Sequence, residues 1–234
     1  MRVDALLPAP GETVDLEGDA LRGWLADRYA LDGAWVRVNL VVALGGQAVG
    51  GDGTSESLTG GIDRALLGVL RRSADVVLVG AGTLRAERLA MPRTAQLAIA
   101  TLRKDFDPAA LPQPAADGRR PMLLCPPGTA HAVQRRVGDA AEVVAVDGDP
   151  AASPRLLVDA LRERGFGRIV CEGGADVAGR LLTAGVVDEL DLTTAPMLMD
   201  GAGVLRSPGT AGRLAGLLRD ETDRLYARWT LPRR

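Results

Sequence analysis

Short apolar runs that alternate with helix-like segments constrain the fold of this 234-residue chain more than any other feature. Buried strands are predicted from runs at 35–44, 75–80, 96–100, 122–125, 142–146, 168–171 and 190–195. Helices are predicted from apolar residues at helical spacing over 60–73, 129–138, 154–165 and 175–184. This alternation predicts an α/β fold with a mostly parallel central sheet flanked by helices.

The two ends of the chain follow a different pattern. Residues 1–34 form a lead-in that holds one predicted helix within 15–29, and Thr59 is a candidate cap for the helix at 60–73. Residues 213–219 and 224–231 predict a terminal antiparallel hairpin. We therefore expect an N-terminal extension, 1–34, and one main domain, 35–234.

Scarce residues limit the chemistry of the chain. It has one histidine, His131, and two cysteines, Cys125 and Cys171, which are too few for a multi-histidine or structural zinc site. A net charge of −2 gives no basic surface for nucleic acid. The apolar runs are too short for a membrane span or a signal peptide, so a cytoplasmic location is expected. These exclusions favour a bound organic cofactor and no metal.

Two strand-to-helix turns are rich in small residues. The first reads VVLVGAGT at 76–83, with Gly80, Gly82 and Thr83, and the second reads CEGGAD at 171–176. Glycine lets a ligand approach the backbone closely, and ligands of parallel sheets bind beyond the carboxyl ends of strands. Each turn is also compatible with a purely structural role. Neither meets the G-x-G-x-x-G or P-loop pattern, which argues against an ordinary Rossmann or nucleoside-triphosphate site.

The residues that follow the strand at 96–100 bear on the type of cofactor. In dinucleotide sites, the residue about 20 positions after the glycine turn often contacts the adenosine ribose. Here the segment reads TLRK at 101–104, which is hydroxylic and basic instead of acidic. It favours a 2′-phosphate and hence NADP, although a solvated loop of charges would have the same composition.

These stretches, in this order, resemble the reductase domain of the riboflavin pathway, which has a dihydrofolate-reductase-like fold and acts on a 5-amino-6-ribosylaminouracil phosphate. The resemblance covers about 35–231 and is most specific over 171–196. Its motifs are VNLVVALGG at 38–46, GTS at 53–55, DR at 63–64, VVLVGAGT at 76–83, EGG at 172–174, LLTAGVVDEL at 181–190 and TTAP at 193–196. The layout, without a deaminase domain, is similar to that of stand-alone actinobacterial members, some of which are thought to act on pterins.

The resemblance implies NADPH as cofactor and a homodimer as the assembly. It implies that Gly80, Gly82 and Thr83 lie near the cofactor and that Thr101 and Arg103 lie near its 2′-phosphate. It implies that the diphosphate lies at Gly173, Gly174 and Ala175. In dihydrofolate reductases the matching glycine pair carries a cis peptide bond, so one is expected between Gly173 and Gly174.

On the substrate side, the resemblance implies contacts from Asn39, Ala43, Asp63, Arg64 and Pro196. Glu172 is the candidate catalytic residue, as the acid or as an orienting group. Structural roles remain open, because Glu172 can cap the following helix, Asp63 can serve the first helical turn and Asn39 can satisfy backbone. Leu181, Leu182, Val186 and Val187 are candidates for core packing or for the dimer interface.

Two departures from the family pattern affect the expected substrate. Members usually read Ser-x-Asp-Gly at the end of the first strand, where this chain has ALGG at 43–46. They often continue to an acidic-Pro pair after the threonine, where this chain has AERL at 86–89. The main expectation is an NADPH-dependent pyrimidine reductase. The alternatives are a dihydropterin-type reductase, an NADP-binding paralogue without the reaction, and a flavin- or deazaflavin-dependent reductase.

Overall fold

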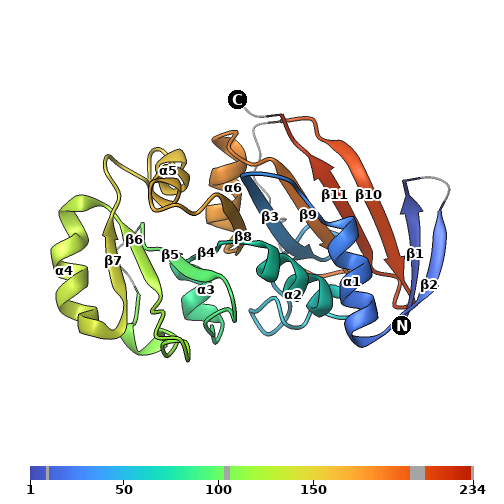
Figure 1. Ribbon diagram of the computed structural model, residues 1–234, viewed down its shortest axis with the longest axis horizontal. Coiled ribbons are helices and arrows are strands. Elements are labelled where there is room, and N and C mark those ends of the chain that lie inside the picture. The colour runs from blue at the N-terminus through green and yellow to red at the C-terminus, as the bar shows by residue number, and fades with distance from the viewer. Residues whose placement is uncertain (9–10, 103–105, 201–208, 233–234) are drawn as a thin grey trace.

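The computed structural model describes residues 1–8, 11–102, 106–200 and 209–232. One sheet runs through these residues, with eleven strands in the order β2-β1-β10-β11-β9-β3-β8-β4-β5-β6-β7 (Figure 1). Its central strands are parallel, as the alternation of strands and helices predicted. The fold is therefore the expected α/β class, with antiparallel strands added at one side.

The parallel strands are the apolar runs of the sequence, and helices cover both of their faces, which explains why they carry few polar residues. Val76–Gly80, for example, is buried at each of its positions. The bounds are β3 (Trp35–Val42), β4 (Val76–Gly80), β5 (Gln96–Ala100), β6 (Met122–Cys125), β7 (Glu142–Ala145), β8 (Arg168–Gly173) and β9 (Glu189–Thr194).

The antiparallel side begins at β9. The expected C-terminal hairpin is present as β10 (Arg213–Asp220) and β11 (Leu225–Thr230), and β11 pairs with β9. The lead-in adds two strands that the sequence did not predict, β1 (Arg2–Leu7) and β2 (Glu12–Asp15). β1 pairs with β10, so an N-terminal strand and a C-terminal strand lie side by side in the sheet.

Helices form a layer on each face of the sheet (Figure 1). The core on one face contains buried residues from α1 (Gly18–Arg28), α2 (Asp63–Ser73), α3 (Ala81–Ala86) and α4 (Pro127–Val137). The core on the other face contains residues from α5 (Arg155–Glu163) and α6 (Ala175–Thr183). Two short 3-10 turns lie at Pro108–Ala110 and Gly138–Ala140. None of the helices in these described ranges has the length and apolarity to cross a membrane.

Several local predictions can be compared with this architecture. The helix expected at 60–73 begins at Asp63, and the Thr59 hydroxyl donates to the Ser55 carbonyl at 3.1 Å, so Thr59 is not its cap. The lead-in shares the core of the main domain, because Val3 and Leu25 are fully buried in the same cluster as α2. Leu181, Leu182, Val186 and Val187 all pack in the other core.

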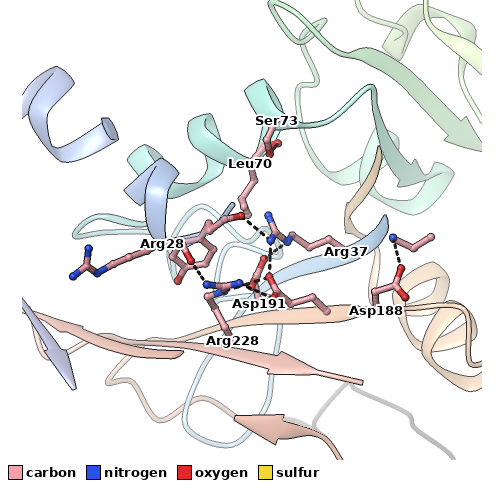
Figure 2. A network of polar contacts seen from close by, with 10 residues as sticks. Arg28, Arg37, Leu70, Ser73, Asp188, Asp191 and Arg228 are labelled. Carbon is pink, nitrogen blue, oxygen red and sulfur yellow. Dashed lines mark hydrogen bonds and ion pairs between the residues drawn. The ribbon is translucent and has the colours of Figure 1, made fainter. Parts of the chain in front are cut away.

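A charged network lies between α1 and the sheet; we call it the arginine network and define it as Arg37, Glu189, Asp191 and Arg228 (Figure 2). Arg37 Nη2 lies 2.6 Å from Glu189 Oε1, and Arg37 Nε lies 3.0 Å from Asp191 Oδ2. Arg228 Nη2 lies 2.8 Å from Glu189 Oε2. Arg37 is fully buried, so each charge is compensated within the protein and not by water.

Candidate functional site

A cavity of about 250 Å³ opens at the carboxyl ends of β3, β4 and β8, where ligands of parallel sheets bind. Its walls also include α2, α3 and the start of α6, together with the loop that follows β3. The polar side chains in these walls are Asn39, Ser55, Thr59, Asp63, Arg71, Thr83, Glu87 and Glu172. We call this space the ring cavity.

A second cavity, of about 320 Å³, lies beyond the ends of β4 and β5. Gly82 and Gly174 line both cavities, so the two spaces adjoin at these glycines. The second cavity is otherwise lined by Gly80, Ala81, Arg85, Ala100, Leu102, Asp176 and Val177. An elongated ligand can therefore lie across the glycine turns with one end in each space.

The glycine turns present bare backbone to these spaces. Gly173 and Gly174 have φ values of +136° and +37°, which L residues with a side chain rarely adopt. A Cβ at Gly82 would meet only Arg85, 3.9 Å away. The Thr83 hydroxyl accepts a hydrogen bond from the Gly174 amide at 2.6 Å, which ties the two turns together.

The expected cis peptide bond is not found at the glycine pair. Gly173 and Gly174 are joined by a trans peptide, and the cis bond among the described residues lies between Leu7 and Pro8. The tight turn is produced instead by the two positive φ values, which only glycine adopts readily.

The side chain of Glu172 lines the ring cavity, but its carboxylate is already paired with Arg71. Arg71 Nε lies 2.9 Å from Oε1, and Arg71 Nη2 lies 2.7 Å from Oε2, in a two-pronged contact. Burial raises the pKa of Glu172, and the paired guanidinium opposes that shift. The carboxylate does not cap α6, and it holds Arg71 at the wall of the cavity.

Asp63 is the first residue of α2 and is only 7% exposed. Its Oδ1 accepts a hydrogen bond from the Thr193 hydroxyl of β9 at 2.7 Å. Asn39 of β3 lines the same cavity, and its Oδ1 is buried without a hydrogen-bond partner among the described residues. We call Asn39, Asp63 and Thr193 the acceptor cluster. Burial raises the pKa of Asp63.

A turn of the C-terminal hairpin fixes the start of α2. Asp220 Oδ2 accepts hydrogen bonds from the Tyr226 hydroxyl at 2.6 Å and from the Ile62 amide at 3.0 Å. Gly61, with φ +54°, passes so close that a Cβ there would lie 1.7 Å from the same oxygen. This contact sets the position of Asp63, two residues further on.

The loop after β3 closes the outer side of the ring cavity. The Ser55 hydroxyl donates to Glu87 Oε1 at 2.7 Å, which joins this loop to the end of α3. Both residues line the cavity. One part of the cavity wall is therefore built by a contact between two segments that lie 32 residues apart in the sequence.

Nine of the predicted site residues lie in the walls of the two cavities: Asn39, Asp63, Gly80, Gly82, Thr83, Glu172, Gly173, Gly174 and Ala175. The other predicted residues do not line them. Ala43 is buried against Leu58 and Ala195, Pro196 is exposed, and Arg64 pairs with Glu56 in solvent.

The two residues predicted for the 2′-phosphate are placed differently from the glycine turns. Thr101 is 2% exposed, and its hydroxyl donates to the Leu124 carbonyl at 3.1 Å. Arg103 lies outside the described residues. The assignment of both to a cofactor phosphate stays a prediction.

Sequence reasoning did not name Arg71 or Ser55 as parts of the site, and it included Glu87 only within the segment 86–89 that bears on the expected substrate. A signal existed for Arg71, because Asp63, Leu67 and Arg71 are spaced by four residues and so share one face of the helix. No local signal exists for the Ser55–Glu87 contact, because it joins positions that are 32 residues apart.

The scarce residues lie outside this chemistry. His131 is exposed on α4, and Cys125 and Cys171 are buried and free. Burial raises the pKa of Cys171 to about 12, so its thiol is unreactive at neutral pH. Among the described residues, no group of three or more His, Cys, Asp or Glu side chains is arranged to hold a metal ion.

The chain matches a known protein family and known proteins. The family model of the RibD C-terminal domain matches residues 34–223. A 2,5-diamino-6-ribosylamino-4(3H)-pyrimidinone 5′-phosphate reductase of Methanothermobacter thermautotrophicus is 29% identical over 205 residues, which cover 82% of this chain and 92% of the relative.

Solved structures show the same fold. A pyrimidine reductase-like protein from Corynebacterium diphtheriae has a TM-score of 0.71 and 22% identity, over 86% of this chain and 93% of that one. The riboflavin biosynthesis reductase of Saccharomyces cerevisiae has a TM-score of 0.62 and 15% identity, over 91% and 98%.

Proposed function

This chain belongs to the RibD C-terminal domain family of riboflavin-pathway pyrimidine reductases, and on that premise we propose that it is an NADPH-dependent reductase of a ribosylaminopyrimidine 5′-phosphate. The observation that carries the proposal is the pair of adjoining cavities at the glycine turns. One cavity has the polar side chains needed to orient a flat ring, and the other gives an elongated cofactor room beyond β4 and β5.

The residues present fit NADPH. Gly82, Gly173 and Gly174 leave bare backbone toward the cavities, and a Cβ at any of them would fill space that a cofactor needs. Gly82, Thr83, Gly173, Gly174 and Ala175 would hold the cofactor where the spaces adjoin. When bound, NADPH would supply a hydride to an imine-like carbon of the substrate, whose nitrogen takes up one proton.

The protein positions the reactants and excludes water. Glu172 has both carboxylate oxygens engaged by Arg71, which favours its orienting role over the role of free acid. It would act as a positioning residue that fixes a guanidinium at the cavity wall, where that cation can bind an anionic group of the substrate or cofactor. The Ser55–Glu87 contact would keep the loop over the cavity.

The family and the cavity support the proposed substrate class. The methanogen relative is named for a ribosylaminopyrimidinone 5′-phosphate, and the expected substrate of this chain is a ring of that type, such as 5-amino-6-(5-phosphoribosylamino)uracil. The ring cavity is concave and combines apolar walls with polar side chains that can orient a small planar ligand.

The reaction is tested by incubating the purified chain with NADPH and each pyrimidine substrate while the reduced-nicotinamide absorbance is followed. We expect substrate-dependent loss of that absorbance, and a smaller rate with NADH. Thermal stabilisation by NADPH alone gives a second readout. If NADPH neither stabilises the protein nor is consumed, the proposal is wrong.

Homodimerisation and a cytoplasmic location remain proposals. The apolar cluster at Leu181–Val187 packs in the core of one chain, so a dimer would use other surfaces. Light scattering at micromolar concentration would give the mass of the assembly directly.

A further inference from the structure

The arginine network meets the ring cavity at one pair of residues on neighbouring strands. In the parallel register of β3 and β9, Asn39 lies opposite Asp191. Residues opposite each other on strands about 4.8 Å apart point to the same face of the sheet. Asn39 lines the ring cavity, whereas Asp191 is 2% exposed and belongs to the network (Figure 2). Asp191 is therefore a buried acid directly behind a wall of the cavity.

Both members of this pair lack a hydrogen-bond donor. Asn39 Oδ1, Asp191 Oδ1 and Asp191 Oδ2 are all buried without a hydrogen-bond partner among the described residues. Arg37 Nε lies 3.0 Å from Asp191 Oδ2, yet its N–H is not directed to form a hydrogen bond. A buried acceptor without a donor is costly, so three of them at one place call for a donor that an ionised Asp191 does not provide.

A proton on Asp191 supplies that donor. A neutral carboxyl group has one O–H to donate and keeps acceptor capacity on its other oxygen. Donated across the register to Asn39 Oδ1, this O–H gives the amide oxygen its missing partner and uses the carboxyl oxygen that carries the proton. One proton thus pairs groups that both lack a partner in the protein.

The surroundings of Asp191 favour the protonated form at neutral pH. The cations that face it are Arg37 of β3 and Arg228 of β11, the anion is Glu189 of its own strand, and Tyr29 faces it from the end of α1. Burial, strengthened by Glu189 and opposed by the two guanidinium groups, raises the pKa of Asp191 to about 8. Below that pH the carboxyl group keeps its proton.

This proton decides which end of the Asn39 amide meets a ligand. An amide has an acceptor oxygen and a donor nitrogen, and its neighbours determine how the two are placed. While Asp191 holds the proton, Asn39 Oδ1 stays turned inward and Nδ2 is left to donate into the ring cavity. An ionised Asp191 accepts only, so it attracts Nδ2 and leaves Oδ1 for the cavity.

We propose that Asp191 is a positioning residue of the reductase, whose protonated carboxyl group holds the Asn39 amide with Nδ2 directed at an acceptor atom of the substrate ring. This proposal rests on the reductase function proposed above and deepens it. Asp191 does not itself reach the cavity and acts through Asn39. When Asp191 loses its proton to solvent, the amide reverses and meets the same ring atom with an acceptor.

The test is the dependence of kcat/KM on pH, measured with NADPH and 5-amino-6-(5-phosphoribosylamino)uracil. In the wild type, kcat/KM should fall by at least about 10-fold as the pH rises through about 8, because a ligand acceptor then faces another acceptor. Asp191→Asn offers an N–H at every pH, so its profile should lack this alkaline fall. Asp191→Leu has no donor and should be impaired at every pH.

Two further variants show whether the effect runs through Asn39. Asp19→Asn makes the same substitution at a fully exposed carboxylate in the first turn of α1 and should leave the wild-type profile unchanged. Asn39→Ala removes the amide, so adding Asp191→Asn to it should change the profile no further. If Asp191→Asn removes an alkaline fall in the Asn39→Ala background as well, Asp191 does not act through Asn39 and the proposal is wrong.

Infrared difference spectra of the wild type and Asp191→Asn separate this proposal from the proposed function. We expect the carbonyl stretch of a protonated carboxyl group at neutral pH, and its loss above about pH 8. If that loss weakens calorimetric binding of the pyrimidine but NADPH is never oxidised, the reductase proposal fails and the role of Asp191 stands. If the band is missing at neutral pH, or both proteins show the same alkaline fall in activity, the role of Asp191 is wrong although the reductase function holds.

Discussion

The arginine network and the acceptor cluster are built on one face of the same two strands, yet they have opposite electrostatic character. In the register of β3 and β9, Arg37 lies opposite Glu189, Asn39 lies opposite Asp191, and Thr193 lies opposite Val41, nearer the ends of the two strands. In the network, carboxyl groups face guanidinium groups at 2.6–3.0 Å. In the cluster, acceptors face a cavity.

This difference shows how a structural polar group is distinguished from a functional one in this fold. Both regions are buried and titratable, so burial alone does not separate them. The network brings guanidinium and carboxyl groups within ion-pair distance of each other inside the protein, which makes it part of the framework. The cluster leaves Asn39 Oδ1 without a partner among the described residues at a cavity wall, which is unfavourable for folding and useful for recognition.

The largest effect is expected when one partner of the network is removed. Arg37→Ala removes the cation that lies between Glu189 and Asp191, leaves Arg228 as the cation paired with Glu189, and should lower the free energy of unfolding by about 3–5 kcal/mol. Urea denaturation measures this loss. Arg22→Ala, which breaks an exposed pair with Asp19, is the control and should change stability by less than about 1 kcal/mol. Equal losses in the two variants would show that the network is not part of the framework.

The next effect concerns the contact that fixes the start of α2. Gly61→Ala places a Cβ 1.7 Å from Asp220 Oδ2 and should lower stability by about 2–3 kcal/mol. Gly18→Ala is matched to it, because Gly18 has the same φ of +54° and no atom within 4 Å. That control should lose only about 1 kcal/mol. Thermal unfolding of both variants gives the comparison, and losses of the same size would show that Asp220 does not press against Gly61.

A smaller change in stability is expected when the pH is varied. Burial, strengthened by the Glu189 carboxylate and opposed by Arg37, raises the pKa of Asp191 to about 8. Between its ordinary value of 3.8 and about 8, the folded protein therefore holds a proton that the unfolded chain has lost. Stability should fall as pH rises through this window and level off above it.

Asp191→Asn isolates this contribution, because the amide cannot ionise. Urea denaturation at a series of pH values should give a flatter profile between pH 5 and 8 in the variant, as the linkage relation requires. The lowered pKa of Glu189 acts at the acid end, where stability is lost as that carboxylate is protonated. An unchanged slope in the variant would mean that Asp191 is already ionised in the fold.

Much of the framework could be predicted from the sequence, because its parallel strands are continuous apolar runs and its turns carry glycine. The strands β1 and β2 could not be predicted. β1 pairs with β10, which follows about 200 residues later, and β2 pairs only with β1, so neither short strand is fixed by its local sequence. The observed start of α2 differs from the predicted one for a similar reason. It is set by the contact of Asp220 with the Ile62 amide and not by Thr59.

The residues of the candidate site that were named from the sequence have a pattern within one segment. The contacts that join two distant segments were not predicted. The glycine turns and Asp63 lie at the ends of recognisable elements, so their patterns are local. Glu172 was predicted as the catalytic residue and lines the ring cavity, but its pairing with Arg71 depends on a contact across 101 residues. The partner of a buried charge decides its role, and sequence patterns do not name that partner.

The most direct test of the contrast between the two regions is the unfolding free energy of Asp63→Asn, measured at neutral pH beside its kcat/KM. The amide keeps an oxygen for Thr193 and removes a buried, unpaired charge, so stability should stay within about 1 kcal/mol of the wild type or rise. In the same variant, kcat/KM for the ribosylaminopyrimidine substrate should fall by at least about 100-fold. A loss of about 3 kcal/mol with activity retained would place Asp63 in the framework and contradict this account.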